Sequence, residues 1–217
     1  MLRDTELDAA LAAPPSGGSS SASHSSCAFE GILVACFSVH PLVAHFAKKY
    51  PETAVTGIFE ASVITALPLL QPPPAMYGEQ AAKIQQWGIV TTGEFWEDHL
   101  AHGVASFLGH SPEKADDGNS RFAGVFSTGL DAGDLHTASK EEVEQKMSEA
   151  TRKLLEGRNV GCVVMGCGAM TGLAGIIRRT AGEVYGETAA KSMYMFDGVK
   201  AGVMVLESMI ESRKLFQ

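Results

Sequence analysis

The sequence has little positive charge. Lys and Arg together number 17 against 25 Asp and Glu, which gives a formal net charge of −8 at pH 7. No cluster of basic residues stands out along the chain. Nucleic acids and anionic membrane surfaces are therefore not expected as partners, because both select basic patches.

Cysteine is also scarce, with four residues in all: Cys27, Cys36, Cys162 and Cys167. Their spacing matches no common zinc pattern, so no metal site is predicted. The first residues include Arg3, Asp4, Glu6 and Asp8 and do not resemble a secretory signal. We therefore expect a cytoplasmic protein with free thiols rather than disulfides.

Nucleotide-binding motifs are missing. The segment GCGAMTG lacks the lysine of a phosphate-binding loop and the spacing of a dinucleotide fingerprint, so no cofactor is expected. The uncharged run 160–177 has about the minimal length of a membrane span. Its glycines favour a strand, a loop and a helix instead.

What the chain does contain is an alternation of short apolar runs and helical patterns. Residues 1–28, rich in Pro, Gly and Ser, are predicted to be a flexible segment. Strands are expected at 31–37, 54–58, 87–92, 122–128, 160–165 and 193–196. Helices are expected from Pro41, at 60–70, 95–108 and 141–156, from about 171, and after 199. This order predicts an α/β fold with parallel sheets, in which ligands bind at the carboxyl ends of the strands.

Two cysteines stand at the ends of predicted strands, in matching positions. Cys36 and Cys167 each lie at the carboxyl end of an apolar run and before a predicted helix, where backbone N–H groups and a helix N-terminus favour the thiolate. For either cysteine alone, a buried core thiol is the simpler interpretation. Two thiols on opposite sides of one carbon, however, can remove and return a proton, which inverts a stereocentre without a cofactor.

The segments VACFSVHPLV, TGIFEAS, WGIVTTG, VVMGCGAM and FDGVKAGV stand in this order along the chain. Together they resemble the aspartate/glutamate/hydantoin racemase superfamily, and within it the fungal members of the hydantoin-racemase branch. The resemblance implies two Rossmann-like or flavodoxin-like lobes, related by a pseudo-twofold axis, with the active site in the cleft between them. Lobe 1 would comprise residues 29–86 and 193–217, and lobe 2 residues 87–192.

The resemblance also implies the site residues. The two catalytic bases would be Cys36 and Cys167. The substrate-binding residues would flank them or lie at a neighbouring strand end: Phe37, Ser38, Thr91, Thr92, Gly168 and Ala169. For the two threonines, a turn cap before Glu94 is the alternative.

Three further polar residues are secondary candidates. His40 lies close to Cys36 and is a candidate for tuning its thiolate, or for beginning the helix at Pro41. Glu60 follows the second predicted strand and is a candidate for orienting the cleft or binding substrate. Asp197 is a candidate for the same role, or for capping the last helix.

The resemblance implies a cofactor-independent racemase acting on 5-substituted hydantoins or a related cyclic ureide such as allantoin. The small-molecule substrate would be the main partner, and we expect a homo-oligomer. Two features depart from the family pattern: the usual first strand with its Asn-Pro-Asn loop has no counterpart, and Gly-Cys-Ala-Gly-Met is replaced by GCGAM. An Asp/Glu racemase is an alternative from the same superfamily, and the missing first strand makes a truncated, non-catalytic ligand-binding member the other.

Overall fold

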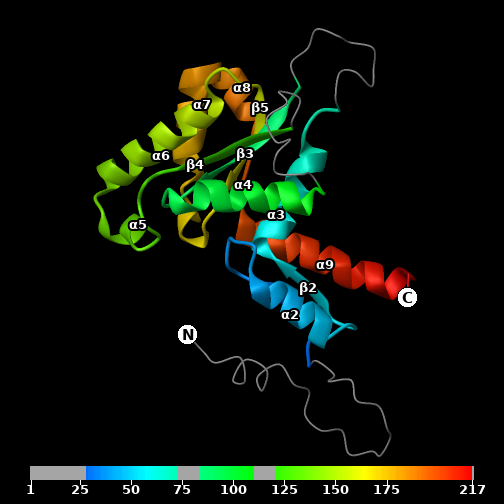
Figure 1. The fold of residues 1–217 in the computed structure, drawn as a ribbon. Helices are drawn as coiled ribbons and strands as arrows, with labels where there is room; N and C mark the ends of the chain where they lie inside the picture. Colours follow the sequence, from blue (N-terminus) through cyan, green and yellow to red (C-terminus); the bar gives the residue numbers. More distant parts are fainter. Residues whose placement is uncertain (1–27, 73–83, 110–120, 217) are drawn as a thin grey trace, which may run out of the picture.

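The computed structural model describes residues 28–72, 84–109 and 121–216 (Figure 1). The predicted flexible segment, apart from its last residue, and Cys27 lie outside these ranges. Within them, strands and helices alternate along the chain and every strand pair is parallel. The predicted α/β fold with parallel sheets is confirmed.

The larger sheet has four strands in the order β4-β3-β5-β6. They are β3 (Gln86–Thr91), β4 (Phe122–Ser127), β5 (Val160–Met165) and β6 (Tyr194–Asp197). Met165 pairs with Val90 on one side and with Asp197 on the other. The strands therefore end at the same level, and all four carboxyl ends lie at one edge of the sheet.

Helices cover both faces of this sheet (Figure 1). On one face lie α6 (Lys140–Leu155) and α7 (Ala174–Tyr185), packed on Val163 and Met165. On the other lie α3 (Ile58–Leu69) and α4 (Phe95–Phe107), packed on apolar side chains such as Trp87. A parallel sheet buried on both faces explains why its strands are near-continuous apolar runs.

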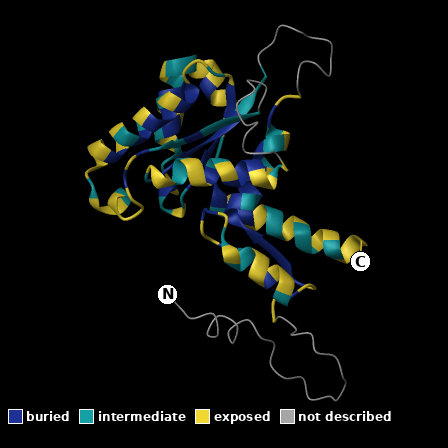
Figure 2. Ribbon diagram, in the orientation of Figure 1, coloured by how far each residue is buried: buried dark blue, intermediate teal, exposed yellow. Residues whose placement is uncertain are grey.

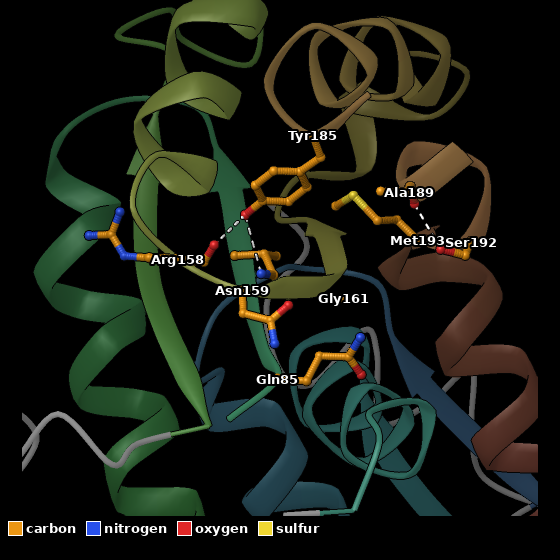
Figure 3. Close-up of a pocket in the computed structure, with 9 residues that line it drawn as sticks. Gln85, Arg158, Asn159, Gly161, Tyr185, Ala189, Ser192 and Met193 are labelled. Carbon is orange, nitrogen blue, oxygen red and sulfur yellow. Dashed lines mark hydrogen bonds between the residues drawn. The ribbon is translucent and has the colours of Figure 1, made fainter. Parts of the chain in front are cut away.

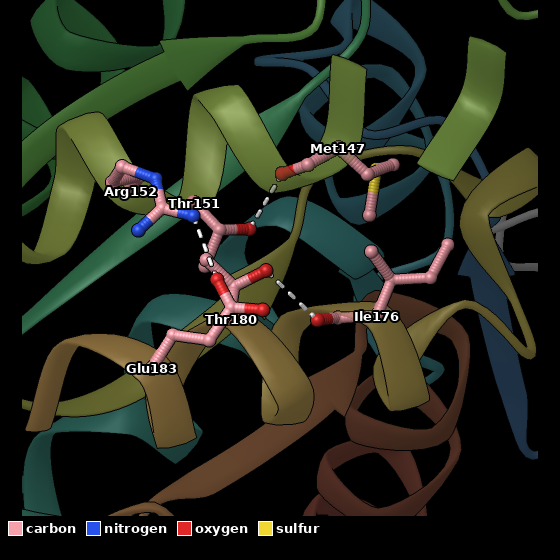
Figure 4. A network of polar contacts seen from close by, with 6 residues as sticks. All are labelled: Met147, Thr151, Arg152, Ile176, Thr180 and Glu183. Atoms are coloured by element: carbon pink, nitrogen blue, oxygen red, sulfur yellow. Dashed lines mark hydrogen bonds and ion pairs between the residues drawn. The ribbon is translucent and has the colours of Figure 1, made fainter. Parts of the chain in front are cut away.

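Polar contacts form within and between α6 and α7 (Figure 4). Ser139 caps the start of α6, because its Oγ accepts a hydrogen bond from the Glu142 backbone N–H. Arg152 Nη2 on α6 lies 2.7 Å from Glu183 Oε2 on α7. Because this ion pair is exposed to solvent, it contributes little, and the apolar faces of the two helices supply most of the stability.

The smaller sheet pairs β1 (Gly31–Val34) with β2 (Ala54–Gly57). Helix α2 (Pro41–Lys49) packs on one side of it, and α9 (Gly198–Phe216) on the other. Gly202 permits the close approach of α9, since a methyl group there would lie 2.8 Å from Leu33 Cδ1. Strand β2 is consequently buried throughout (Figure 2).

The structure corrects some predicted boundaries. Strand β1 ends at Val34 rather than at residue 37, and α7 begins only at Ala174, after a 3-10 turn at Gly168–Met170. Two short helices were not predicted: α5 (Asp134–Thr137) and α8 (Glu187–Ser192).

Residues 193–217, expected together in lobe 1, divide between the two sheets. Strand β6 pairs with β5 in the larger sheet, whereas α9 packs on the smaller one. The chain therefore crosses between the sheets at the junction of Asp197 and Gly198. None of the helices in the described ranges is long and apolar enough to cross a membrane.

Candidate active site

The two candidate cysteines occupy equivalent positions. Strand β1 ends at Val34 and β5 ends at Met165, so Cys36 and Cys167 are each the second residue after a parallel strand. Cys36 is exposed and Cys167 is partly buried. Both thiols therefore stand at the carboxyl ends of strands, the usual location of ligand sites in such sheets.

Cys36 lies in a tight turn. The Ser38 backbone N–H donates to the Cys36 carbonyl at 3.0 Å, and Ser38 Oγ lies 3.3 Å from Cys36 Sγ. The neighbouring side chain, Phe37, is buried and meets the Phe59 ring edge-on, with centroids 5.7 Å apart. Phe37 and Ser38 therefore fix the turn, and the thiol itself remains accessible.

Contacts beyond this turn place it beside the larger sheet. A methyl group at Gly198, the first residue of α9, would lie 2.9 Å from Phe37 Cδ2. A methyl group at Gly103 on α4 would lie 2.6 Å from Val39 Cγ2. The loop that carries Cys36 is thus held between α9 and α4, which follow β6 and β3. These strands flank β5, the strand that Cys167 follows.

The turn at Cys167 is tied to the end of β3. Thr91 Oγ1 donates to the Gly166 carbonyl at 3.0 Å, and the Gly166 N–H donates to the Val90 carbonyl at 2.8 Å. Thr91 is wholly buried and Thr92 nearly so. The Thr91 hydroxyl therefore holds the residue before Cys167, rather than capping the turn before Glu94.

Backbone donors lie next to Cys167. Gly168 and Ala169 open the 3-10 turn, and the first N–H groups of a helical segment have no acceptor within it. Gly168 is exposed, and a methyl group there would meet no atom within 4 Å. These two N–H groups are therefore available to a ligand oxygen.

His40 and Glu60 both lie at helix starts. His40 caps α2, because its Nδ1 accepts a hydrogen bond from the Leu42 N–H at 3.2 Å. Glu60 is the third residue of α3, and its Oε2 is buried without a hydrogen-bond partner. Burial raises the pKa of the Glu60 carboxyl, while the backbone N–H groups of Glu60 and Gly57 and the nearby His40 oppose the rise.

Asp197 caps the last helix. Its Oδ1 accepts a hydrogen bond from the Lys200 N–H at 2.9 Å, and its Oδ2 lies 3.6 Å from Lys200 Nζ. The side chain is buried at the end of β6. The capping alternative predicted for this residue is therefore the one that the structure contains.

Removing this cap should lower stability. We expect Asp197→Ala to cost about 0.5–2 kcal/mol, because the Lys200 N–H loses its acceptor. Asp197→Asn keeps an acceptor oxygen and is the matched control. Thermal unfolding of both variants measures the difference, and equal melting temperatures for the two would contradict the capping role.

Cys162 belongs to the core. It lies within β5, and burial raises the pKa of its thiol to about 12. It therefore stays protonated at neutral pH and is unsuited to acid–base chemistry. Within the described ranges, no group of three or more His, Cys, Asp and Glu side chains is placed to hold a metal ion.

Two cavities lie away from the cysteines. One, of about 370 Å³, opens at the amino ends of β3 and β5, between Gln85, Asn159 and Met193 (Figure 3). In it the Tyr185 hydroxyl is fully engaged, since it lies 2.8 Å from the Leu155 carbonyl and accepts from the Val160 N–H. The other, of about 280 Å³, lies between α4 and α6. Neither contains a predicted site residue.

Comparison with known proteins identifies relatives along most of the chain. The family model described as Asp/Glu/Hydantoin racemase matches residues 4–206. An uncharacterized protein of Schizosaccharomyces pombe, C1F7.10, is 29% identical over 181 residues, which are 83% of this chain and 63% of that protein. Protein DCG1 of Saccharomyces cerevisiae is 27% identical over 188 residues, 84% of this chain and 66% of DCG1. The chain thus spans a little under two thirds of the length of these relatives.

Solved structures share the fold. An allantoin racemase from Klebsiella pneumoniae has a TM-score of 0.58 at 23% identity, over 85% of this chain and 61% of that one. Glutamate racemase RacE1 from Bacillus anthracis has a TM-score of 0.57 at 12% identity, over 86% and 60%. The match of the family model, over far more than half of the sequence, shows that the chain belongs to the Asp/Glu/hydantoin racemase family.

Proposed function

We propose that this protein is a cofactor-independent racemase that inverts the ring carbon C5 of 5-substituted hydantoins or of a related cyclic ureide such as allantoin. One observation carries the proposal. Cys36 and Cys167 stand at equivalent positions after parallel strands, and contacts of the Cys36 loop hold it against α4 and the start of α9, the helices that follow the strands flanking β5. A racemase needs two proton-transfer groups that serve one carbon from opposite sides.

In the proposed reaction, the thiolate of one cysteine removes the C5 proton, and the C–H electron pair moves into the ring as an enolate. The thiol of the other cysteine then donates its proton to the opposite face of C5. The first cysteine ends as a thiol and the second as a thiolate. The N–H groups of Gly168 and Ala169 would stabilise the enolate oxygen, as preorganised donors do in other enzymes.

Thr91 has a positioning role in this proposal. Its hydroxyl holds the Gly166 carbonyl, so the turn at Cys167 keeps its place relative to β3. Phe37 and Ser38 serve the turn at Cys36 in the same way. Asp197 connects the two sheets by fixing the start of α9.

The charges at the site argue against an amino-acid substrate. An Asp/Glu racemase must hold an α-carboxylate, which calls for cationic or amide donors. None of the predicted site residues is a Lys or an Arg, and Glu60 lies just after β2. A neutral cyclic ureide avoids the repulsion that a dicarboxylate would meet.

A non-catalytic ligand-binding protein is the second candidate. In this alternative, the site would bind a hydantoin without proton exchange.

Proton NMR in D₂O tests the proposal. The purified protein is incubated with L-5-benzylhydantoin or allantoin, and the C5–H signal is followed against a sample without protein and against Cys36→Ser and Cys167→Ser. We expect the signal of the L enantiomer to disappear faster with the wild-type protein than without protein, and faster than with the cysteine variant that lacks the base facing that proton. Exchange of L-Asp or L-Glu but of neither ureide would instead identify an amino-acid racemase. Calorimetric binding of the hydantoin without exchange would identify the non-catalytic alternative.

A further inference from the structure

The cavity of about 280 Å³ lies at the carboxyl end of β4. Among the described strands, β4 is the outermost one on its side of the larger sheet, and α4 and α6 both contact it (Figure 1). Apart from Gly129 and Ala150, every residue that lines the cavity has a polar or charged side chain. We call it the α4–α6 cavity. Its small size and polar walls favour a small polar ligand over a drug-sized apolar one.

The two helices bring charges of opposite sign to the cavity. On α6, Lys146 is paired with Glu149 at 3.9 Å, whereas the side chain of Lys153 has no ion-pair or hydrogen-bond partner among the described residues. At the start of α4, Glu97 Oε1 accepts a hydrogen bond from the Ser127 N–H at 2.7 Å. The carboxylate of Glu94 has no such partner within the described ranges. The cavity therefore contains one uncompensated ammonium and one uncompensated carboxylate.

The end of β4 adds a buried hydroxyl. Thr128 is only 4% exposed, and its Oγ1 accepts a hydrogen bond from the Leu130 N–H at 3.2 Å. A threonine hydroxyl can donate as well as accept, and the described residues offer no acceptor for its proton. This proton is therefore available to a ligand oxygen in the cavity.

We propose that the α4–α6 cavity binds a small zwitterion with the charges of an α-amino acid. The carboxylate of the ligand lies toward Lys153 and accepts a hydrogen bond from the Thr128 hydroxyl. Its ammonium group lies toward Glu94 and Glu97. This inference goes beyond the proposed function, because the site is separate from both cysteine turns and involves no reaction.

The charges disfavour other classes of ligand. A simple anion would meet the carboxylates at the start of α4, and a simple organic cation would meet the ammonium group of Lys153. A bound metal ion is not supported either, since no group of three or more His, Cys, Asp and Glu side chains in the described residues is placed to hold one. A zwitterion satisfies both walls at once.

Hydrogen bonds connect the cavity to the turn at Cys167. The Thr128 N–H donates to the Thr91 carbonyl at 2.9 Å, and Thr91 Oγ1 donates to the Gly166 carbonyl at 3.0 Å. A ligand bonded to Thr128 is therefore two residues removed from the residue that precedes Cys167. We expect the amide signals along this path to respond when the cavity is occupied.

Titrations followed in proton–nitrogen NMR spectra test the inference without relying on turnover. L-alanine, propionate and ethylamine are added separately to the full-length protein at constant pH. Propionate is alanine without the ammonium group, and ethylamine is alanine without the carboxylate. We expect L-alanine to shift the amide signals of Thr128 and Gly129, and with them those of Thr91 and Gly166. Its Kd should be lower than that of either analogue.

Two variants separate the charges. Lys153→Met should raise the Kd of L-alanine and of propionate by about 2- to 5-fold, the range of one exposed ion pair, and should leave that of ethylamine unchanged. Glu94→Gln should raise the Kd of L-alanine and of ethylamine and leave that of propionate unchanged. Lys140→Met is the matched control, because Lys140 is exposed on the same helix but does not line the cavity. It should change none of the three.

Several outcomes would overturn the inference. L-alanine that leaves the signals of Thr128 and Gly129 in place, or that binds no more tightly than its two analogues, would exclude a zwitterion site. Shifts centred on Gly168 and Ala169 that persist in Lys153→Met would place the amino acid at the turn of Cys167 instead. Equal losses for all three compounds in Lys153→Met would assign Lys153 a merely structural role. Proton exchange at C5 is a separate measurement, so the racemase proposal stands or falls independently of these results.

Discussion

Replacing Cys167 by serine is expected to lower the rate of racemisation by about 10²- to 10⁴-fold, the contribution of a positioned acid–base group. Serine keeps the shape of the side chain, but its hydroxyl is a far weaker acid than a thiol. The same loss is expected for Cys36→Ser, since inversion needs both groups. Polarimetry of L- and D-5-benzylhydantoin measures the rate.

The two variants should differ in proton exchange. Each retains the thiol that serves one face of C5, and that thiol can still remove a proton and return a deuteron to the same face. In D₂O, Cys36→Ser should therefore exchange C5–H of one enantiomer only, and Cys167→Ser that of the other. If both variants favoured the same enantiomer, the assignment of opposite faces would be wrong.

Cys162→Ala is the matched control for these variants. It removes a thiol from β5, three residues before the end of the strand that leads to Cys167, but this thiol is buried in the core. The variant should keep racemase activity close to that of the wild-type protein. Racemisation as slow as in Cys167→Ser would show that loss of packing, rather than of an acid–base group, explains the effect.

Phe59→Ala is expected to have the largest effect on stability. The Phe59 ring is almost wholly buried, meets Phe37 edge-on, and lies against Gly103 of α4. Truncating a buried phenylalanine typically costs about 3–5 kcal/mol, because the lost contacts leave a cavity. Since a domain of this size loses about 2–4 °C per kcal/mol, the melting temperature should fall clearly.

Phe107→Ala is the matched control for Phe59→Ala. It deletes the same atoms from an exposed position and should change the free energy of unfolding by about 0.5 kcal/mol or less. Urea unfolding followed by circular dichroism measures both variants. Equal midpoints would mean that Phe59 does not connect the small sheet, α3 and α4 in the way that the contacts indicate.

The sequence was sufficient to predict the order of the strands and of the longer helices. The run at 160–165 is bounded by Asn159 and Gly166, and its observed limits agree with the prediction because every residue within it is buried. Helix α2 begins at Pro41 as predicted, since proline fits the first turn of a helix. The strand-end positions of Cys36 and Cys167 also follow from this alternation.

Contacts between segments that lie far apart in the chain could not be predicted from the sequence. The apolar run at 31–37 continues past β1, because Phe37 turns into the core on Phe59 rather than extending the strand. The sheet to which β6 belongs depends on its pairing with β5, which no local pattern encodes.

No local sequence pattern predicts the roles of the glycines at positions 103 and 198. Their importance lies in which side chain approaches them, Val39 in one case and Phe37 in the other. The roles of the threonines were likewise ambiguous. The Thr91 hydroxyl donates to the carbonyl of Gly166, which lies 75 positions further along the chain. From the sequence alone, this role cannot be distinguished from that of a turn cap.

The packing of α9 on β1 has a consequence for how the protein is made. Gly31 lies directly under Leu206 and Ile210, so the first described strand is covered by the last described helix. The strands of the larger sheet and the helices between them all precede α9 along the chain. On the ribosome, the larger sheet can therefore assemble before α9 is available to pack on the smaller one. During this interval β1 and β2 expose apolar surface that α9 later covers.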